Sequence, residues 1–209
     1  MRSADWYFDF ISPFAYLAWM RLAELPQDLE IRRRPVLLAG LLNHWGQKGP
    51  AEIGAKRLWT YRWCTWQAAQ QAIPFRFPAA HPFNPLPYLR LAIAAGATQH
   101  AIHTIFQALW TTGANPADER VLDELLACLD VTRAQLAASE IKDGLRLETQ
   151  RAVERGVFGV PTLAIDDELF WGADALGFVK ACLADPGVLR TAEMQRVAAL
   201  PTGATRKLD

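Results

Sequence analysis

The stretch DWYFDFISPFAYLA, residues 5–18, contains the turn from which the rest of the fold can be worked out. Its first half is aromatic and partly alternating, which predicts a strand over residues 5–11. Ser12 then stands where a helix N-cap is favoured, and Pro13 stands where the first helical residue is favoured. Apolar residues keep helical spacing from there to Pro26. The stretch therefore predicts a strand that passes directly into a helix at Ser12.

A second stretch, GVFGVPTLAIDDELFWGAD (residues 156–174), carries the other β pattern. Two short apolar segments, 162–165 and 169–171, flank a polar turn and predict a β-hairpin. Pro161 precedes the first segment, where a proline removes no hydrogen bond of the sheet. A closing helix is expected over residues 174–183.

Between these stretches the pattern is first β and then helical. Residues 29–38 predict a second strand, and the arginines at 32–34 are typical of a solvated edge strand. From residue 55 to 156 nearly every periodic segment is helical, and Asn115 followed by Pro116 predicts the start of one of these helices. The two β blocks are too short to form separate sheets, so we expect them to pair with each other. The sequence thus predicts one α/β domain formed by residues 1–45 and 156–209, interrupted by a helical insertion at residues 46–155.

Composition excludes several classes of protein. The chain has 209 residues with 22 basic and 22 acidic side chains, so it lacks the basic excess of a nucleic-acid binder. No apolar run approaches the ~20 residues of a membrane span, and Asp5 and Asp9 interrupt any signal-peptide core. We therefore expect a soluble, cytoplasmic protein. Three widely spaced cysteines argue against a disulfide framework and predict buried, reduced thiols, and the four histidines show no metal-ligand spacing, so we expect no metal site.

Ser12 is the first candidate for chemistry. Free backbone N–H groups and the helix dipole favour an anion at a strand-to-helix turn, and a hydroxyl there can donate a hydrogen bond to it. Serine is also an ordinary helix cap, so this feature alone is weak evidence. A βαβ…ββα order, an active turn at the first helix and a proline before the third strand together resemble the thioredoxin fold. Its usual Cys-x-x-Cys is replaced here by SPFA, residues 12–15, which excludes dithiol–disulfide exchange at this turn.

The large helical insertion narrows the resemblance to DsbA-like proteins. Within that group the chain resembles the 2-hydroxychromene-2-carboxylate isomerase family, whose architecture the kappa-class glutathione transferases share. The resemblance covers about residues 5–184, and the motifs that carry it are DFISPFAYLA (9–18), RPVLL (34–38), PFNPLP (82–87), RGVFGVPT (155–162) and ELFWGAD (168–174).

The resemblance implies glutathione as cofactor and assigns residues to it. Ser12, followed by Pro13 and Phe14, would contact the sulfur. Val160 and Pro161 would pair with the peptide of glutathione as an added strand does, across a cis peptide bond. The resemblance further assigns Asp174 to the ammonium end of the glutamyl group, and assigns Gln47 to a polar contact for which the family usually has asparagine.

The same resemblance implies a reaction. The glutathione thiolate would add reversibly to an aryl-ylidene pyruvate, interconverting 2-hydroxychromene-2-carboxylate and trans-o-hydroxybenzylidenepyruvate or a similar intermediate of aromatic degradation. Lys56, or its neighbour Arg57, could hold the substrate carboxylate or could form a surface salt bridge. Asn84 and Tyr88 could meet the phenol oxygen.

Several alternatives stay open. The helix predicted over residues 56–73 spaces Trp59, Trp63 and Trp66 on one face, which could line a substrate pocket or form helix core. A kappa-like transferase or peroxidase and a non-catalytic thioredoxin-like binding module are the competing functions. The resemblance also suggests a homodimer.

Overall fold

Four strands form one mixed sheet in the computed structural model, which describes residues 2–204. Their order in the sheet is β2-β1-β3-β4, with β2 parallel to β1 and the other neighbours antiparallel. The strands are β1 (Arg2–Phe8), β2 (Leu29–Pro35), β3 (Thr162–Ile165) and β4 (Glu168–Trp171). The predicted pairing of the N-terminal and C-terminal β blocks is confirmed, since β1 lies beside β3.

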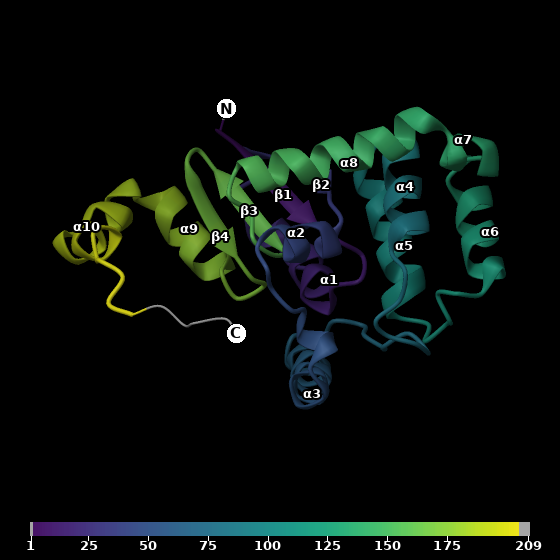
Figure 1. Ribbon diagram of the computed structural model, residues 1–209, viewed down its shortest axis with the longest axis horizontal. Coiled ribbons are helices and arrows are strands. Elements are labelled where there is room, and N and C mark those ends of the chain that lie inside the picture. Colours follow the sequence, from purple (N-terminus) through teal and green to yellow (C-terminus); the bar gives the residue numbers. More distant parts are fainter. Residues whose placement is uncertain (1, 205–209) are drawn as a thin grey trace.

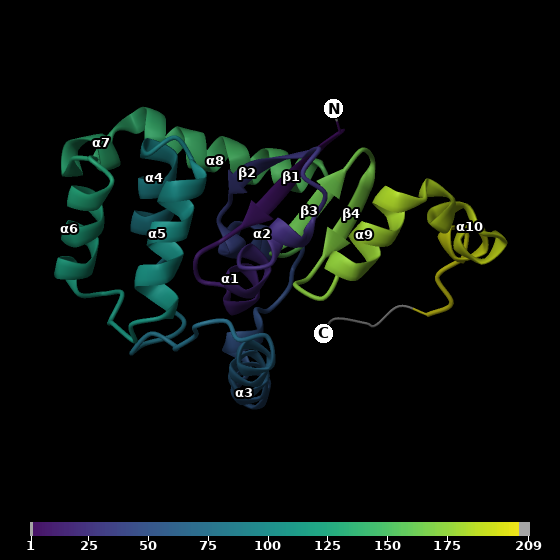
Figure 2. The same cartoon turned by 180° about the vertical axis from the view of Figure 1, so that it is seen from behind.

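Helices surround this sheet and extend beyond it (Figure 1). Helix α8 runs along the sheet and reaches the bundle of α4, α5 and α6. Helix α10 lies at the end of the molecule away from this bundle, and α3 projects from the body between them, as the reverse view also shows (Figure 2). Short 3-10 turns lie at Leu22–Glu24, Pro50–Glu52 and Pro186–Arg190. The α-helices are α1 (Pro13–Trp19), α2 (Leu38–His44), α3 (Gly54–Gln70), α4 (Leu86–Ala94), α5 (Gln99–Trp110), α6 (Glu119–Cys128), α7 (Arg133–Ala137), α8 (Ser139–Glu154), α9 (Leu176–Ala184) and α10 (Ala192–Ala198).

Strand β1 is covered on both faces, which explains why its sequence alternates only in part. Side chains alternate across a strand, so Trp6 and Phe8 share one face and Tyr7 takes the other. Trp6 and Phe8 stack at 4.4 Å and belong to the main core, with α1, α5 and α9. Tyr7 packs in a smaller cluster with Leu41 of α2 and Ala152 of α8. The strand that carries the candidate turn is therefore held from both sides.

The helical insertion shares this core with the sheet. The Trp110 indole N–H of α5 donates to the Phe10 carbonyl oxygen at 2.9 Å. The Tyr16 hydroxyl of α1 donates to the Pro74 carbonyl oxygen at 2.6 Å. Trp110 also stacks on Tyr16 with ring centroids 6.4 Å apart. These contacts attach the insertion to the segment on either side of Ser12.

Some predicted boundaries were wrong. The first helix ends at Trp19 and is followed by a 3-10 turn, because Leu25 must be extended before Pro26. Helix α6 does not begin at Asn115, because the Asn115 side chain accepts from Ala117 N and forms a local turn instead.

Three further corrections concern the end of the first strand, a helix that was not predicted and one cysteine. The first strand stops at Phe8, helix α2 was not predicted, and Cys128 is exposed rather than buried. All three cysteines are free. Within residues 2–204, no helix is long and apolar enough to cross a membrane.

Candidate active site

The turn between β1 and α1 is held by a buried carboxylate. Asp9 is fully buried, and its two oxygens accept the backbone N–H of Ile11 at 3.1 Å and of Leu38 at 2.8 Å. Burial raises the pKa of Asp9 to about 7, although these backbone donors act in the opposite direction. The side chain thus connects the end of β1 to the start of α2 and fixes the residues just before Ser12.

Ser12 caps α1 as predicted. Its Oγ accepts the backbone N–H of Ala15 at 3.2 Å, and its backbone is extended at the N-cap position. The Ser12 hydroxyl donates to no protein acceptor within the described part of the chain. One hydrogen of this nearly buried side chain is therefore available to an acceptor from outside the protein.

His81 supports the same turn from the proline-rich segment that joins α3 to α4, just before the motif PFNPLP (82–87). Its Nε2 lies 2.8 Å from the Ile11 carbonyl oxygen, and its Nδ1 lies 2.7 Å from the Tyr61 hydroxyl of α3. A carbonyl only accepts, so Nε2 must carry the hydrogen. The Tyr61 hydroxyl also lies 2.7 Å from the His81 carbonyl oxygen, and burial lowers the pKa of His81, which favours the neutral ring.

The turn before β3 has the expected geometry. The peptide bond between Val160 and Pro161 is cis. Among the described residues, neither the N–H nor the C=O of Val160 has a hydrogen-bond partner. The Pro161 carbonyl accepts from Gly172 N at 2.9 Å, which connects this turn to the loop after β4. Val160 therefore presents an open backbone edge to which an extended peptide could add.

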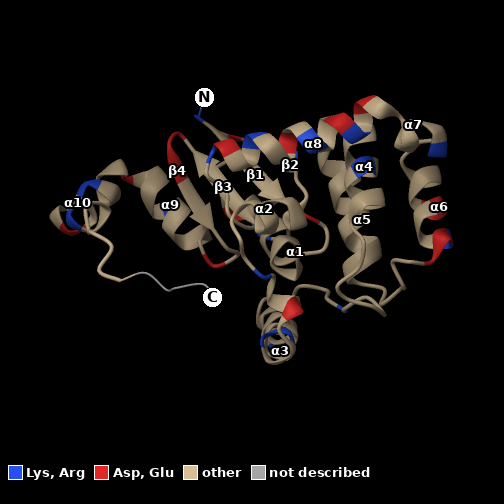
Figure 3. Cartoon of the chain, viewed as in Figure 1, with Lys and Arg blue, Asp and Glu red and all other residues tan. Residues whose placement is uncertain are grey.

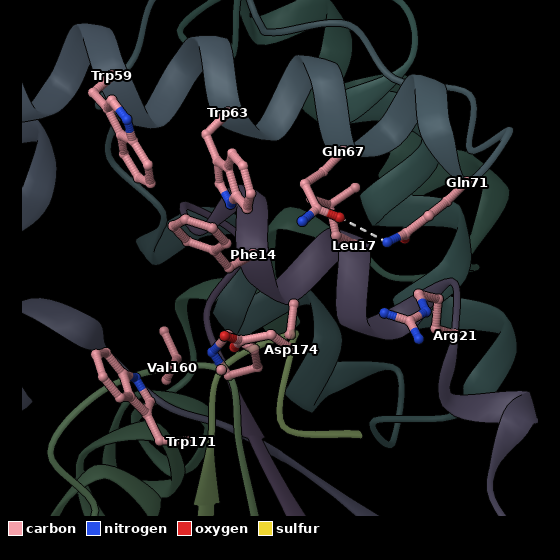
Figure 4. A pocket seen from close by; sticks show the side chains of 13 residues that line it. Phe14, Leu17, Arg21, Trp59, Trp63, Gln67, Gln71, Val160, Trp171 and Asp174 are labelled. Atoms are coloured by element: carbon pink, nitrogen blue, oxygen red, sulfur yellow. Dashed lines mark hydrogen bonds between the residues drawn. The ribbon is translucent and has the colours of Figure 1, made fainter. Parts of the chain in front are cut away.

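A cavity of about 570 Å³ lies between this turn, α1 and α3. This volume is within the usual range for a small-molecule site. Figure 4 shows Trp59 and Trp63 pointing from α3 toward Phe14 of α1, with Val160, Trp171 and Asp174 on the opposite side. The walls of the cavity are formed by Phe14, Leu17, Arg21, Trp59, Trp63, Gln67, Gln71, Val160, Pro161, Trp171, Gly172, Ala173 and Asp174.

The tryptophan stripe of α3 is not helix core. Trp59, Trp63 and Trp66 are 59%, 36% and 52% exposed; Trp59 stacks on Trp63 with ring centroids 5.4 Å apart, and Trp66 lies tilted against Trp63 at 5.2 Å. The alternative that places tryptophans at the pocket is the correct one for Trp59 and Trp63, whereas Trp66 lies outside the cavity wall. Helical spacing identifies the face but does not say whether that face meets the core or a cavity.

The cavity holds one acidic and one basic side chain. Asp174 is exposed and has no hydrogen-bond or ion-pair partner within residues 2–204, so its carboxylate can bind a cation. Arg21 donates to Glu24 at 2.7 Å, and Glu24 also accepts from Lys180 at 2.9 Å. The two cations hold the pKa of Glu24 at about 2. Since two cations share one carboxylate, this edge of the cavity keeps a positive charge.

The structure brings together the predicted residues at the two turns. Phe14, Val160, Pro161 and Asp174 line the cavity, whereas Ser12 and Pro13 precede Phe14 in the chain and are not part of the cavity wall. Lys56 lies one helical turn before Trp59 on the same face of α3 but outside the cavity wall.

Three other predicted residues lie elsewhere. Gln47 is exposed beyond the end of α2. The Asn84 side chain accepts from Leu86 N, at the start of α4. Tyr88 is 1% exposed in the helical core, and its hydroxyl donates to the Pro116 carbonyl at 2.7 Å.

Sequence reasoning missed Arg21 and the glutamines Gln67 and Gln71. The positions of Phe14, Leu17 and Arg21 share one face of the first helical segment, and this spacing could have indicated that Arg21 follows the cavity wall. Gln67 and Gln71 continue the spacing of Trp59 and Trp63 by one and two turns, and their side chains hydrogen-bond at 2.7 Å (Figure 4).

Comparison with known proteins agrees with this geometry. A family model for the DsbA-like thioredoxin domain matches residues 4–184. The 2-hydroxychromene-2-carboxylate isomerase of Pseudomonas putida is 32% identical over 197 residues, covering 86% of this chain and 93% of that protein. The protein of the same name from Sphingobium xenophagum is 30% identical over 200 residues, covering 88% and 99%.

A solved structure of a 2-hydroxychromene-2-carboxylate isomerase has the same fold. It superposes with a TM-score of 0.77 at 27% identity, covering 92% of this chain and 98% of the other. The chain belongs to the DsbA-like thioredoxin family and, within it, to the group that contains the 2-hydroxychromene-2-carboxylate isomerases.

Proposed function

We propose that this protein binds glutathione in the 570 Å³ cavity and uses it to isomerise an aromatic carboxylate. The proposed reaction interconverts 2-hydroxychromene-2-carboxylate and trans-o-hydroxybenzylidenepyruvate, or a closely similar pair. The names of the relatives support the reaction class. The observation that carries the proposal is one cavity lined by both the open Val160 backbone and an Asp174 carboxylate that has no partner within residues 2–204. Ser12, whose hydroxyl hydrogen is free, lies two residues before Phe14 of the same wall.

The donors and acceptors present fit a short peptide thiol. Val160 offers one N–H and one C=O, which is what an extended peptide needs for strand addition. Asp174 offers an acceptor for the ammonium group of a γ-glutamyl residue. Phe14, two residues after Ser12, adds an apolar surface to the cavity wall, against which the sulfur of such a ligand could lie.

Bound glutathione would supply a thiolate able to add reversibly to a conjugated double bond, which lets that bond rotate. Ser12 would hold the sulfur as thiolate by donating its O–H, while its Oγ still accepts from Ala15 N. A hydrogen bond to a charged acceptor is worth ~1.5–3 kcal/mol. Helix α1 has only seven residues, so the hydroxyl rather than the helix dipole carries this role.

The remaining cavity suits the proposed substrate. Trp59 and Trp63 offer parallel aromatic surfaces, with ring planes inclined by only 12°. Arg21 offers a cation for a carboxylate, in place of the predicted Lys56, although it remains shared with Glu24. Asp174 and Arg21 would thereby orient the cofactor and the substrate at different edges of the cavity.

An ultraviolet absorbance assay with trans-o-hydroxybenzylidenepyruvate tests the proposal. We expect conversion that requires glutathione, leaves its concentration unchanged and does not occur with S-methylglutathione. Conversion at the same rate without glutathione would contradict the cofactor assignment. Consumption of glutathione with a chlorinated aromatic acceptor, without isomerisation, would instead support a kappa-like transferase. If calorimetry shows glutathione binding but neither activity is found, the protein would be a non-catalytic binding module.

We also propose, from the family resemblance, that the protein acts as a cytoplasmic homodimer. Sedimentation equilibrium tests the assembly, and a monomer at micromolar concentration would contradict it. Cell fractionation tests the compartment.

A further inference from the structure

Arg33 differs from the two arginines beside it. Arg32 and Arg34 turn to one face of β2, where both bind the Asp5 carboxylate at 3.1 and 2.9 Å. Arg33 turns to the opposite face and has no ion-pair partner within residues 2–204. Its guanidinium carbon lies 5.9 Å from the centre of the Trp19 ring.

The Arg33 guanidinium is only partly satisfied. One terminal nitrogen donates to the Gln99 side-chain oxygen at 3.2 Å. The Nε atom is buried and has no hydrogen-bond partner among the described residues. Burial lowers the pKa of Arg33. This atom is closed to solvent, whereas the terminal nitrogens are not and donate only the one hydrogen bond to Gln99 within residues 2–204, so a ligand can accept from them.

Among residues 2–204, no acidic side chain forms an ion pair with Arg33. Helix α5, which packs beside it, has no Asp, Glu, Lys or Arg, as its uniform colour shows (Figure 3). Glu30 lies on the other face of β2, with Arg32 and Arg34. Glu24 is held by Arg21 and Lys180. The positive charge is therefore open to an anion from solution.

A second cavity, of about 270 Å³, lies directly in front of this guanidinium. It shares no lining residue with the larger cavity. Most of its wall is apolar, with Trp19, Met20, Leu22, Ala23 and Ile31 beside the polar side chains of Arg33, Gln99 and His103.

His103 adds a donor to the polar side of this cavity. Its Nδ1 accepts the Trp19 indole N–H at 3.2 Å. An indole nitrogen only donates, so the neutral ring carries its hydrogen on Nε2, and His103 is exposed. Arg33 and His103 thus offer donors beside an apolar wall.

We propose that this second cavity binds a small monocarboxylic acid with an apolar body, its carboxylate on Arg33 and its apolar part against Trp19 and Ile31. A phosphate or sulfate would not use the apolar wall, and a neutral compound would not satisfy the guanidinium. The volume limits the ligand to about the size of a single-ring acid. The site is independent of the proposed glutathione reaction.

Benzoate is a suitable probe, with the Trp19 indole N–H resonance as a local reporter assigned through Trp19→Phe. We expect saturable benzoate shifts of this resonance in the wild type, also when glutathione is present. Benzamide, which has the same shape without the charge, and inorganic phosphate should not produce them. Arg33→Met should weaken benzoate binding about 10- to 100-fold, the range of a charged hydrogen bond. Arg146→Met, on the exposed side of α8, should leave it unchanged.

Two results would overturn the proposal. One is a benzoate response confined to tryptophans of the larger cavity. The other is equal binding of benzamide or phosphate. Thermal unfolding of each variant shows whether it folds, and the comparison of benzoate with benzamide on the wild type does not depend on any variant.

Discussion

Among single residues, Asp9, Ser12 and Asp174 each do something different at the turn between β1 and α1 or at the cavity. Both oxygens of Asp9 accept a backbone N–H, so an amide in their place would set one N–H group against another. Ser12 accepts with its oxygen and keeps its hydrogen free. Asp174 is the opposite case, because no hydrogen bond or ion pair within residues 2–204 uses its carboxylate. Changes at these three positions should therefore have different consequences for stability and for binding.

Asp9 should give the unfolding free energy a distinctive pH dependence. Its folded pKa of about 7 exceeds the ~3.9 of an unfolded aspartate, so the folded state binds more protons between these values. The resulting stabilisation is fully present below pH ~4 and is lost as the pH rises through ~7. In urea titrations, the stability advantage of the wild type over Asp9→Asn should shrink over this window, by at most ~4 kcal/mol. The exposed turn variant Asp167→Asn is the control, and an advantage for Asp9 that is independent of pH would contradict the expectation.

Asp174→Ala should weaken glutathione binding without affecting the fold. We expect a loss of about tenfold, the lower end for a hydrogen-bonded charge, since the carboxylate is exposed. Calorimetric titration with glutathione measures it, and Asp167→Ala is the matched exposed aspartate outside the cavity. Equal affinity in wild type and Asp174→Ala would remove Asp174 from the site.

At the scale of elements, β1 organises the molecule because it contributes to both faces of the sheet. One face carries Trp6 and Phe8 into the main core, and the other places Asp5 among three arginines. Arg155 extends this group to the residue after α8, at 3.1 Å from Asp5. The mixture of acidic and basic side chains along α8 is visible in Figure 3.

Asp5→Asn should destabilise the protein by ~1–3 kcal/mol, because it leaves three arginines without their common partner. The arginines are 34% to 46% exposed, so solvent and salt screen their repulsion. Urea unfolding at low and high salt should therefore show a larger loss at low salt. Asp123→Asn, in an exposed pair with Arg133, should cost less than ~0.5 kcal/mol. A loss at Asp5 that does not respond to salt would argue for packing rather than charge.

The elements that sequence reasoning predicted well are those with local signals. The Ser12 cap and Pro13, the turn before β3 and the short β3–β4 hairpin all follow from residues within a few positions of each other. The errors arose where a distant contact or a competing local bond decided the outcome. Asn115 was expected to start α6, but its side chain closes a turn and Asp118 caps the helix instead.

At the scale of the whole molecule, the cavity forms where the helical insertion faces the thioredoxin-like part. The wall from α1 and the two turns could be predicted from motifs, because each motif lies on one segment. The wall from α3 could not, because the direction of the Trp59 and Trp63 face depends on how the insertion is placed. Arg21 was missed although its spacing from Phe14 and Leu17 is a local signal, and Tyr88 was expected at the site although it packs within the insertion.

Trp63→Ala tests whether the tryptophan face of α3 serves binding. Trp63 is 36% exposed, so we expect a stability loss of about 1 kcal/mol or less, well below that of a buried tryptophan. The KM for the aromatic substrate should rise several-fold, since part of the cavity wall is removed. Trp66→Ala changes the neighbouring ring outside the cavity and should leave KM unchanged. Equal effects of both variants on KM would contradict a specific role for Trp63.

In the proposed function, Ser12 holds the sulfur of bound glutathione as thiolate. The most direct measurement is a pH titration of the thiolate ultraviolet absorbance in the binary complex, for the wild type and for Ser12→Ala. A hydrogen bond worth ~1.5–3 kcal/mol corresponds to roughly 1–2 pKa units, so the variant should titrate at a pH higher by that amount while glutathione affinity changes far less. Coincident titration curves would contradict the account and leave Ser12 with only its role as the cap of α1.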